Sequence, residues 1–453
     1  MKWGWTSAAC ALLAGAAAAL SSPGETQTAP PLRIGTSGDY APFSFPSETA
    51  AGGFDGFDVV LARAFAEAEG RPLELVRFHW PELDAALREG RFDIAMSGVT
   101  VRADRSLVGR FSLPVAESGA VALVRDGERF PDLAALERGR AHIVVNAGGH
   151  LEQIAHERFP NAQVEALSNN AQVRSTLLEG RADAAVSDTL EAREWRRGAE
   201  QLRVLGPLSR DRKAPLVRAD LPELAEHLDL WLFAREADGT LSELRRVWFG
   251  DRHPAATAAP FAALLAAADE RLALMPLVAE AKRRAGLPVT NEAQEARVLD
   301  AAVRAVDEEA ARIGQARRAE AAVRGVFQAL IAAARRVESR ALEIPRIEGT
   351  PHPPSLDGAL RPAISRITPK IAEALVRLDA LPPRGALRQR VREELRTPNV
   401  ADEDAERLAD ALSAYLEAGG VPRPVAVSAT RPAPQPAGTP AVGPGRGRVL
   451  PSQ

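Results

Sequence analysis

Three short patterns in the first half of this 453-residue chain could bind a flat, anionic small molecule. Met96–Thr100 followed by Arg105 combines free backbone N–H groups, hydroxyls and a guanidinium, which together can clamp a carboxylate. Asn146–His150 forms a turn before a predicted helix and can present N–H groups to a second anion. Phe43 and Trp80 follow predicted strands and could form the wall of a pocket for a ring. Core positions for the two aromatic residues, and a solvated position for Arg105, are the structural alternatives.

The elements that carry these patterns alternate between strands and helices over residues 32 to about 250. Strands are predicted at residues 32–35, 73–78, 92–97, 141–145 and 182–187, and helices at residues 56–70, 83–90, 150–159 and 173–180. This alternation is typical of an α/β fold with mainly parallel sheets. Beyond residue 255 the pattern predicts only helices, at residues 260–286, 292–314, 316–342, 356–378 and 402–418.

Composition and the two ends of the chain indicate an exported protein that acts on small molecules. The 46% hydrophobic and 26% charged content is ordinary for a soluble protein, and the net charge of -3 does not favour nucleic acid. Residues 1–22 combine Lys2, an apolar run and a small-residue exit, which predicts a signal peptide and a periplasmic location; a buried N-terminal helix is the alternative. Cys10, the only cysteine, lies inside that run, so the mature chain would have no disulfide. Residues 419–453 are rich in Pro and Gly and predict a disordered tail.

Residues 32–250 resemble the periplasmic solute-binding proteins of family 3, and within them the cyclohexadienyl dehydratases. The resemblance rests on the three patterns in this order, on Ser187–Arg193, on Ala234–Thr240 and on Trp248–Gly250. It implies two α/β lobes around a ligand cleft, with the chain crossing between lobes near residues 120 and 215. It also implies prephenate or arogenate as the substrate.

This first resemblance implies a role for each site residue. Glu191 matches the acid that protonates the departing ring hydroxyl, provided that the cleft keeps it protonated; a solvated glutamate at a helix start is the alternative. Arg105 would hold the side-chain carboxylate, Ser97 and Thr100 would set its register, and Asp188 would orient neighbouring polar groups. The other implied substrate-binding residues are Phe43, Trp80, Asn146, Gly149 and His150.

The chain departs from the dehydratase pattern at several of these positions. A tyrosine and a lysine are replaced by Val115 and Ala120, two threonines by His150 and Gln172, and a further tyrosine by Pro215. Loss of the lysine removes a charge-assisted hydrogen bond worth ~1.5–3 kcal/mol. His150 could restore that charge or could indicate a different ligand.

Residues 256–418 resemble the secreted, gamma-subclass chorismate mutases, which are all-helical. The resemblance rests on Asp269–Lys282, Gly286–Val289, Glu295–Leu299 and Val326–Phe327, in that order. Chorismate rearranges in one intramolecular step without proton transfer, so cations and hydrogen-bond donors suffice for catalysis. The predicted fold class is therefore a two-lobed α/β periplasmic-binding-protein fold followed by an all-α chorismate mutase domain.

The second resemblance also implies site residues. Arg271 and Lys282 are eleven residues apart and return to nearly the same face of a helix. Arg271 and Arg361 match the carboxylate-binding arginines, Lys282 matches a lysine that contacts carboxylate and ether oxygen, and Glu338 would face the ether oxygen as a protonated acid. At three positions Asn291, Gln294 and Ala334 replace the usual residues; the first two can still form hydrogen bonds and the third cannot.

Together the two resemblances predict a bifunctional periplasmic enzyme that converts chorismate to prephenate and prephenate to phenylpyruvate. Neither reaction needs a cofactor or a metal. The expected partners are the small molecules chorismate, prephenate or arogenate, with no nucleic acid and no membrane after signal cleavage; a homo-oligomer remains an alternative. Two other functions stay open: an amino-acid-type solute-binding protein with an inactive helical domain, and a chorismate mutase with a vestigial binding domain.

Overall fold

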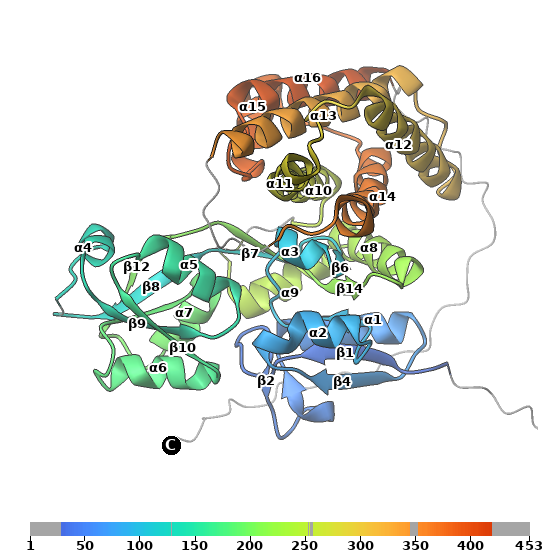
Figure 1. The fold of residues 1–453 in the computed structure, drawn as a ribbon. Helices are drawn as coiled ribbons and strands as arrows, with labels where there is room; N and C mark the ends of the chain where they lie inside the picture. Colours follow the sequence, from blue (N-terminus) through green and yellow to red (C-terminus); the bar gives the residue numbers. More distant parts are fainter. Residues whose placement is uncertain (1–28, 128, 252, 254–256, 345–351, 419–453) are drawn as a thin grey trace, which may run out of the picture.

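The computed structural model describes residues 29–127, 129–251, 253, 257–344 and 352–418. The predicted signal peptide with its cysteine, and the predicted C-terminal tail, lie outside these residues. The described chain forms three parts, which we call lobe 1, lobe 2 and the helical part (Figure 1).

Lobe 1 is built on a five-stranded mixed sheet with the order β4-β1-β5-β14-β6. Its strands are β1 (Leu32–Thr36), β4 (Leu73–Arg77), β5 (Ile94–Ala95), β6 (Gly109–Phe111) and β14 (Leu216–Arg218), beside a small ribbon of β2 (Phe45–Pro46) and β3 (Phe54–Asp55). Its helices are α1 (Phe57–Ala68), α2 (Leu83–Arg88), α3 (Ala103–Ser106), α8 (Pro222–Ala237) and α9 (Thr240–Phe249). β1 pairs in parallel with β4 and β5, whereas β14 is antiparallel to β5 and β6.

Lobe 2 has a second five-stranded sheet with the order β10-β9-β11-β8-β12. Its strands are β8 (Ala120–Arg125), β9 (His142–Asn146), β10 (Gln163–Leu167), β11 (Ala184–Asp188) and β12 (Leu202–Leu205), and its helices are α4 (Leu133–Arg138), α5 (His150–Arg158), α6 (Asn170–Leu178) and α7 (Thr189–Arg196). Successive side chains of a strand point to opposite faces. Accordingly Ala122 and Val124 of β8 join one core of this lobe, while Val121 and Leu123 join the core on the other face.

The prediction of mainly parallel sheets is wrong. Both sheets are mixed, because β14 and β8 run antiparallel to their neighbours. β8 follows the first hinge strand into lobe 2, and β14 follows the second hinge strand into lobe 1. An antiparallel pair needs no helical crossover between its strands.

Two short strands join the lobes. β7 (Ala116–Ser118) and β13 (Asp211–Lys213) pair antiparallel, with Arg212 opposite Glu117 and Lys213 opposite Ala116. These hinge strands lie between the two sheets, close to the crossings expected near residues 120 and 215. The residues just before lobe 2 and those just after it are therefore neighbours at the boundary between the lobes.

The helical part follows lobe 1 in the chain and packs on it. Its helices are α10 (Pro260–Ala273), α11 (Met275–Ala285), α12 (Glu292–Arg312), α13 (Glu320–Glu343), α14 (Arg361–Arg377), α15 (Arg384–Glu394) and α16 (Asp402–Ala418), with a π-helical turn at Leu356–Leu360. The single helix expected over residues 260–286 is therefore two helices. Pro276 occupies the first turn of α11, where its missing N–H and its ring disfavour a continuous helix. α15 was not predicted, because its sequence is mostly charged and only Leu387 and Val391 of it are buried apolar residues.

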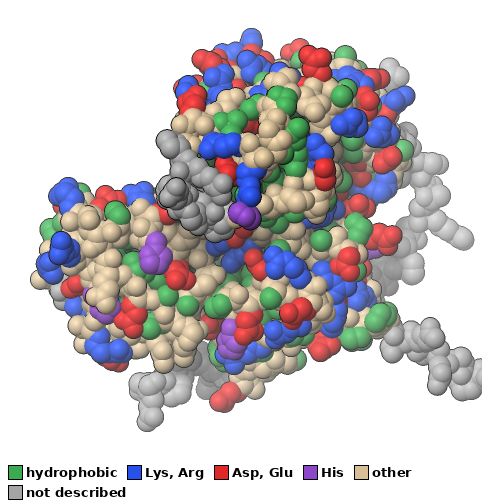
Figure 2. Space-filling model, viewed as in Figure 1, with side chains coloured by type: hydrophobic (Ala, Val, Ile, Leu, Met, Phe, Trp, Pro, Cys, Tyr) green, Lys and Arg blue, Asp and Glu red, His purple; other side chains and the backbone are tan. Residues whose placement is uncertain are grey.

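Lobe 1 and the helical part share one contiguous apolar core, whereas the two cores of lobe 2 are separate. In Figure 1 the helical part lies over α3, β6 and α8 of lobe 1, with α10 and α11 at its centre. A buried ion cluster crosses this boundary, where Arg110 contacts Asp229 at 2.7 Å and Glu373 at 3.2 Å. The face drawn in Figure 2 shows basic and acidic side chains interspersed over all three parts. Within the described residues, no helix combines the length and apolar character needed to span a bilayer.

Candidate active sites

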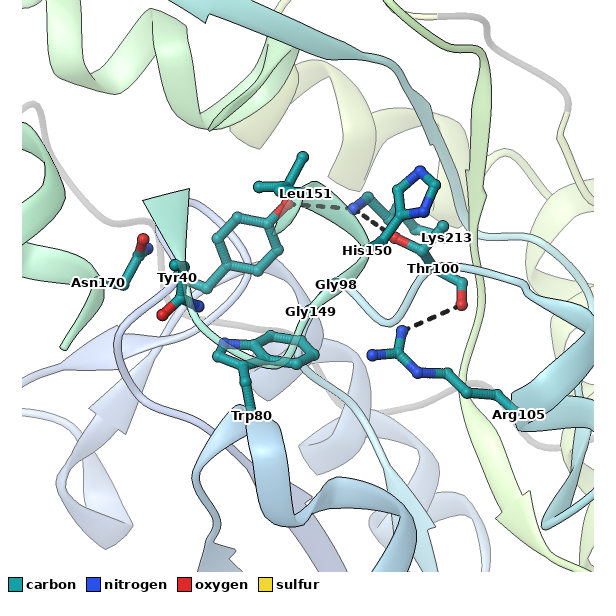
Figure 3. Close-up of a pocket in the computed structure, with 11 residues that line it drawn as sticks. Tyr40, Trp80, Gly98, Thr100, Arg105, Gly149, His150, Leu151, Asn170 and Lys213 are labelled. Atoms are coloured by element: carbon teal, nitrogen blue, oxygen red, sulfur yellow. Dashed lines mark hydrogen bonds between the residues drawn. The ribbon is translucent and has the colours of Figure 1, made fainter. Parts of the chain in front are cut away.

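A small cavity of about 30 Å³ lies between the lobes beside the hinge strands. Its lining residues come from both lobes and from β13 (Figure 3): Tyr40, Trp80, Gly98, Thr100, Arg105, Asn146, Gly149, His150, Leu151, Asn170 and Lys213. This volume admits one or two water molecules and no six-membered ring. A ring-shaped ligand therefore requires the lobes to move apart.

Lys213 of β13 supplies a buried positive charge at the centre of this cleft. Its side chain is 2% exposed, and its Nζ donates to Thr100 Oγ1 at 2.9 Å and to the Tyr40 hydroxyl at 3.1 Å. The same Nζ lies 3.2 Å from a carboxylate oxygen of Asp188 in lobe 2. A buried cation is thus present in the cleft on hinge strand β13, although Ala120 stands where the resemblance implies a lysine.

Arg105 is the second cation of the cleft. It is 3% exposed, its guanidinium lies 5.8 Å from the centre of the Trp80 ring, and it donates to the Thr100 carbonyl at 3.3 Å. Burial lowers the pKa of Arg105 to about 10, so the side chain stays charged at neutral pH. Figure 3 shows Arg105 and Lys213 reaching Thr100 from different elements.

Glu191 is buried one hydrogen bond away from the cleft. Its carboxyl accepts from Asn170 Nδ2 and from Ser187 Oγ, both at 2.6 Å, and Asn170 lines the cavity. Burial raises the pKa of Glu191 well above its ordinary value, against these two hydrogen bonds, and the nearby Asp188 raises it further. A protonated acid is thus favoured at this position.

Asp188 connects the cleft to helix α7. One of its oxygens accepts from the backbone N–H groups of Leu190 and Glu191, at 2.8 and 3.0 Å, and so caps the helix. The other accepts from the Tyr40 hydroxyl across the lobes. Asp188 therefore fixes the start of the helix that carries Glu191 and joins the two lobes at the same time.

The turn at the start of α5 forms the lobe 2 wall. Asn146, Gly149 and His150 all line the cavity, and His150 Nε2 lies 3.0 Å from Asp211 on the hinge strand. Burial alone would raise the pKa of Asp211, but the hydrogen bond from His150 holds that pKa below its ordinary value. Asn146 Oδ1 and His150 Nδ1 are buried without a hydrogen-bond partner among the described residues.

Four residues of the sequence-based set do not line the cleft: Phe43, Ser97, Asp188 and Glu191. Asp188 and Glu191 instead bond residues that line it, namely Lys213 and Asn170. Phe43 is fully buried and packs on Phe57 and Phe249, and Ser97 bonds Ser37. Phe43 thus takes the core position that was its structural alternative, and Ser97 is also fully buried. Five lining residues were not among the predicted site residues, although one of them, Gly98, lies within the Met96–Thr100 pattern: Tyr40, Gly98, Leu151, Asn170 and Lys213. Lys213 could have been found from composition. The chain has 57 Lys and Arg residues together but only four lysines, Lys2, Lys213, Lys282 and Lys370, so each lysine in an otherwise arginine-rich chain is a candidate for a specific role.

A second and larger cavity, of about 470 Å³, lies inside the helical part. All six residues that the second resemblance implied for this site line it: Arg271, Lys282, Asn291, Gln294, Glu338 and Arg361. They come from α10, α11, the start of α12, α13 and α14. Ala334 lines it as well, and so do Arg297 and Arg335.

Two charged residues of this cavity, Arg271 and Glu338, are buried, and Lys282 is 15% exposed in its side chain. Lys282 Nζ donates to Glu338 at 2.6 Å and to the Val289 carbonyl at 2.7 Å. Desolvation lowers the pKa of Arg271 to about 10, and its Nη1 has no hydrogen-bond partner among the described residues. Burial raises the pKa of Glu338, although the hydrogen bond from Lys282 opposes the shift. An unpartnered guanidinium nitrogen beside a Lys–Glu pair can bind an incoming carboxylate.

The rim of the cavity is less constrained. Arg361 is 37% exposed in its side chain and pairs with Asp357. Asn291 caps α12 by accepting from the backbone of Gln294 at 2.9 Å, so its oxygen serves the helix end. Gln294 accepts from Arg297 at 2.7 Å. Within the described residues, no group of three or more metal-binding side chains is found in either site.

Two α/β lobes joined by two hinge strands around a polar cleft are the architecture expected of a solute-binding protein. Residues 32–251 match the family model of the bacterial extracellular solute-binding proteins, family 3, and the chain belongs to this family. That match ends before the helical part.

Among its relatives is an enzyme. The chain is 32% identical over 230 residues to the cyclohexadienyl dehydratase of Pseudomonas aeruginosa, which covers 50% of this chain and 85% of that protein. It is 28% identical over 221 residues to an L-cystine-binding protein of Escherichia coli, covering 48% of this chain and 82% of that protein. A solved ancestral amino acid-binding protein, described as a precursor of cyclohexadienyl dehydratase, is 33% identical and covers 48% of this chain and 95% of that chain, with a TM-score of 0.45.

Proposed function

We propose that the cleft converts prephenate to phenylpyruvate. The observation that carries this proposal is the buried carboxyl of Glu191, whose pKa is raised well above its ordinary value and which bonds a residue lining the cleft. The similarity to cyclohexadienyl dehydratase supports the same reaction. Lys213 and Arg105 provide two cations for the two carboxylates of prephenate.

The proposed reaction proceeds in three coupled changes. The protonated Glu191 gives its proton to the ring hydroxyl, the bond from the ring carbon to that oxygen breaks, and water leaves. The bond from the opposite ring carbon to its carboxylate breaks, its electron pair completes the aromatic ring, and CO₂ leaves. Overall the prephenate dianion and one proton give the phenylpyruvate anion, CO₂ and water. A proton from solvent restores Glu191 for the next turnover.

We propose that the larger cavity isomerises chorismate to prephenate. Its 470 Å³ lies within the usual range for small-molecule sites. Arg271 and Arg361 would hold the two carboxylates, and Lys282 with protonated Glu338 would stabilise charge on the breaking ether oxygen. Because its product is the substrate proposed for the cleft, one chain would carry out both steps. The extracellular family supports the periplasmic location predicted from the N-terminal pattern.

One experiment tests both activities. The purified protein is incubated with chorismate, and chorismate, prephenate and phenylpyruvate are measured over time. We expect phenylpyruvate. Accumulation of prephenate alone would remove the dehydratase proposal, and unchanged chorismate with turnover of added prephenate would remove the mutase proposal.

A binding function is the second candidate. It is favoured by the L-cystine-binding relative and by the buried acids Asp188 and Asp211, which lie beside Lys213 and His150 and could together bind a zwitterion. Calorimetry with a set of amino acids distinguishes the two. Tight binding of an intact amino acid, with chorismate and prephenate both unchanged, would replace the enzymatic proposal by this one.

A further inference from the structure

Three consecutive residues of α10 face three different places in the molecule. Asp269, Glu270 and Arg271 are 8%, 5% and 6% exposed. Successive residues of a helix point about 100° apart. As a result Asp269 meets the hinge strand, Glu270 meets lobe 1, and Arg271 enters the cavity of the helical part.

The first link runs from Asp269 to Lys213. Asp269 binds Arg212 of β13 at 2.6 Å, and Glu394 of α15 binds the same guanidinium at 2.8 Å. Arg212 and Lys213 are neighbours on a strand, so their side chains point to opposite sides. Arg212 therefore anchors β13 to the helical part, while Lys213 projects into the cleft.

The second link runs from Glu270 to Arg105. Glu270 accepts from Ser106 Oγ at 2.9 Å, and its other oxygen accepts from Lys370 at 2.6 Å. Arg366 of the helical part also donates to the Ser106 carbonyl, at 3.0 Å. Ser106 directly follows Arg105 in α3, a helix of four residues. This short helix is thus held from its outer side by the helical part.

Both cations of the cleft are therefore placed by neighbours that bind α10. The carboxylates involved are buried and paired, and a buried ion pair leaves little freedom to either partner, because a separated charge would be left without water. Surface ion pairs would not give this restraint.

We propose that Asp269 and Glu270 are positioning residues of the cleft, which set Lys213 and Arg105 for an anionic ligand. The helical part would then contribute to the affinity of the cleft without touching its ligand. The inference rests on the proposed function only in taking prephenate as the ligand; the placement of Lys213 can be measured without it.

The scarcity of lysine provides a direct measurement. The full chain labelled with ¹⁵N at lysine Nζ gives at most four signals, and the Lys213 signal is identified by its loss in Lys213→Arg. We expect Asp269→Asn to shift the Lys213 signal and to leave the Lys282 signal in place. The matched control is Glu309→Gln, which neutralises a buried acid of the helical part that binds Arg312 and Arg377 instead.

Kinetics with prephenate provide the second measurement. We expect Asp269→Asn and Glu270→Gln each to raise KM about tenfold with kcat within about twofold, since they weaken ligand binding and spare the acid Glu191. Asp269→Glu and Glu270→Asp, which keep the charge, should recover part of the loss. Thermal unfolding of every variant checks that the fold is kept.

Two results would overturn the proposal: an unchanged Lys213 signal and KM in Asp269→Asn, or an equal change in Glu309→Gln, which would mean general loosening. If the unmodified protein does not convert prephenate, the proposed function fails by itself, and the Lys213 signal alone decides the positioning role.

Discussion

The cleft and the helical cavity carry similar charges but differ in how they are enclosed. The cleft is about 30 Å³, and its charged groups bond one another across two lobes, as in the contact between Lys213 and Asp188. The helical cavity is about 470 Å³, and Arg271 keeps an unpartnered nitrogen within the described structure. The charged groups of the cleft pair with one another, so an anionic ligand must replace contacts such as that between Lys213 and Asp188. The helical cavity has open volume beside a guanidinium nitrogen that is unpartnered among the described residues.

The largest expected effect is on the acid of the cleft. Glu191→Gln removes the proton donor and keeps the size of the side chain, so the conversion of prephenate should slow by about 10²- to 10⁴-fold. Isomerisation of chorismate by the same protein should not change. Glu194→Gln, on the same helix and paired with Arg197, is the control. If the Glu191→Gln and Glu194→Gln variants converted prephenate at equal rates, Glu191 would not be the acid of this reaction.

A smaller loss is expected in the helical cavity. Arg271→Ala removes a buried cation that would make a charge-assisted hydrogen bond, worth about 1.5–3 kcal/mol, so kcat/KM for chorismate should fall by about 10- to 150-fold. Conversion of added prephenate should continue. Arg284→Ala, at an exposed position of the neighbouring helix, provides the control. If Arg271→Ala stopped both reactions, the two sites could not be treated as separate.

The pH dependence should separate the sites again. Both proposed acids must be protonated to act, so each activity is present at lower pH and lost as the pH rises through the pKa of its acid. The carboxyl of Glu191 has only neutral hydrogen-bond donors among the described residues, and the nearby Asp188 raises its pKa further. Near Glu338, the cations Lys282 and Arg271 oppose the rise in its pKa. The loss should therefore occur at higher pH for the cleft. Profiles of kcat for each substrate test this order, and a reversed order contradicts it.

The smallest effect is expected from restoring a missing donor. Ala334 lines the helical cavity where the resembled family has a hydroxyl. Ala334→Ser should raise kcat/KM for chorismate by about two- to tenfold, the range of one net hydrogen bond of ~0.5–1.5 kcal/mol. Ala333→Ser, at the preceding buried position, is the comparison. No gain specific to position 334 would mean that the ligand does not reach this wall.

The two sites also differ in how much of them could be predicted from sequence. In the helical part, local spacing decides which face a residue occupies, so Arg271 and Lys282 could be expected in one cavity. The two hydrogen-bond acceptors of Lys213 in the cleft, Thr100 and Tyr40, are 113 and 173 residues away in the chain. Their meeting depends on how the lobes close, which no local pattern contains.

The fold shows the same division. Helices and strands with clear periodicity were predicted close to their observed bounds, for example α1 and β4. The antiparallel direction of β14 and β8 was not predicted, because it depends on the path that the chain takes between the lobes. The core positions of Phe43 and Ser97 likewise depend on contacts with distant residues.

The core shared by lobe 1 and the helical part has a consequence for how this protein unfolds. Because one apolar cluster crosses that boundary, heating should melt these two parts in a single cooperative transition. Lobe 2, with its own cores and two thin connections, can unfold as a separate unit.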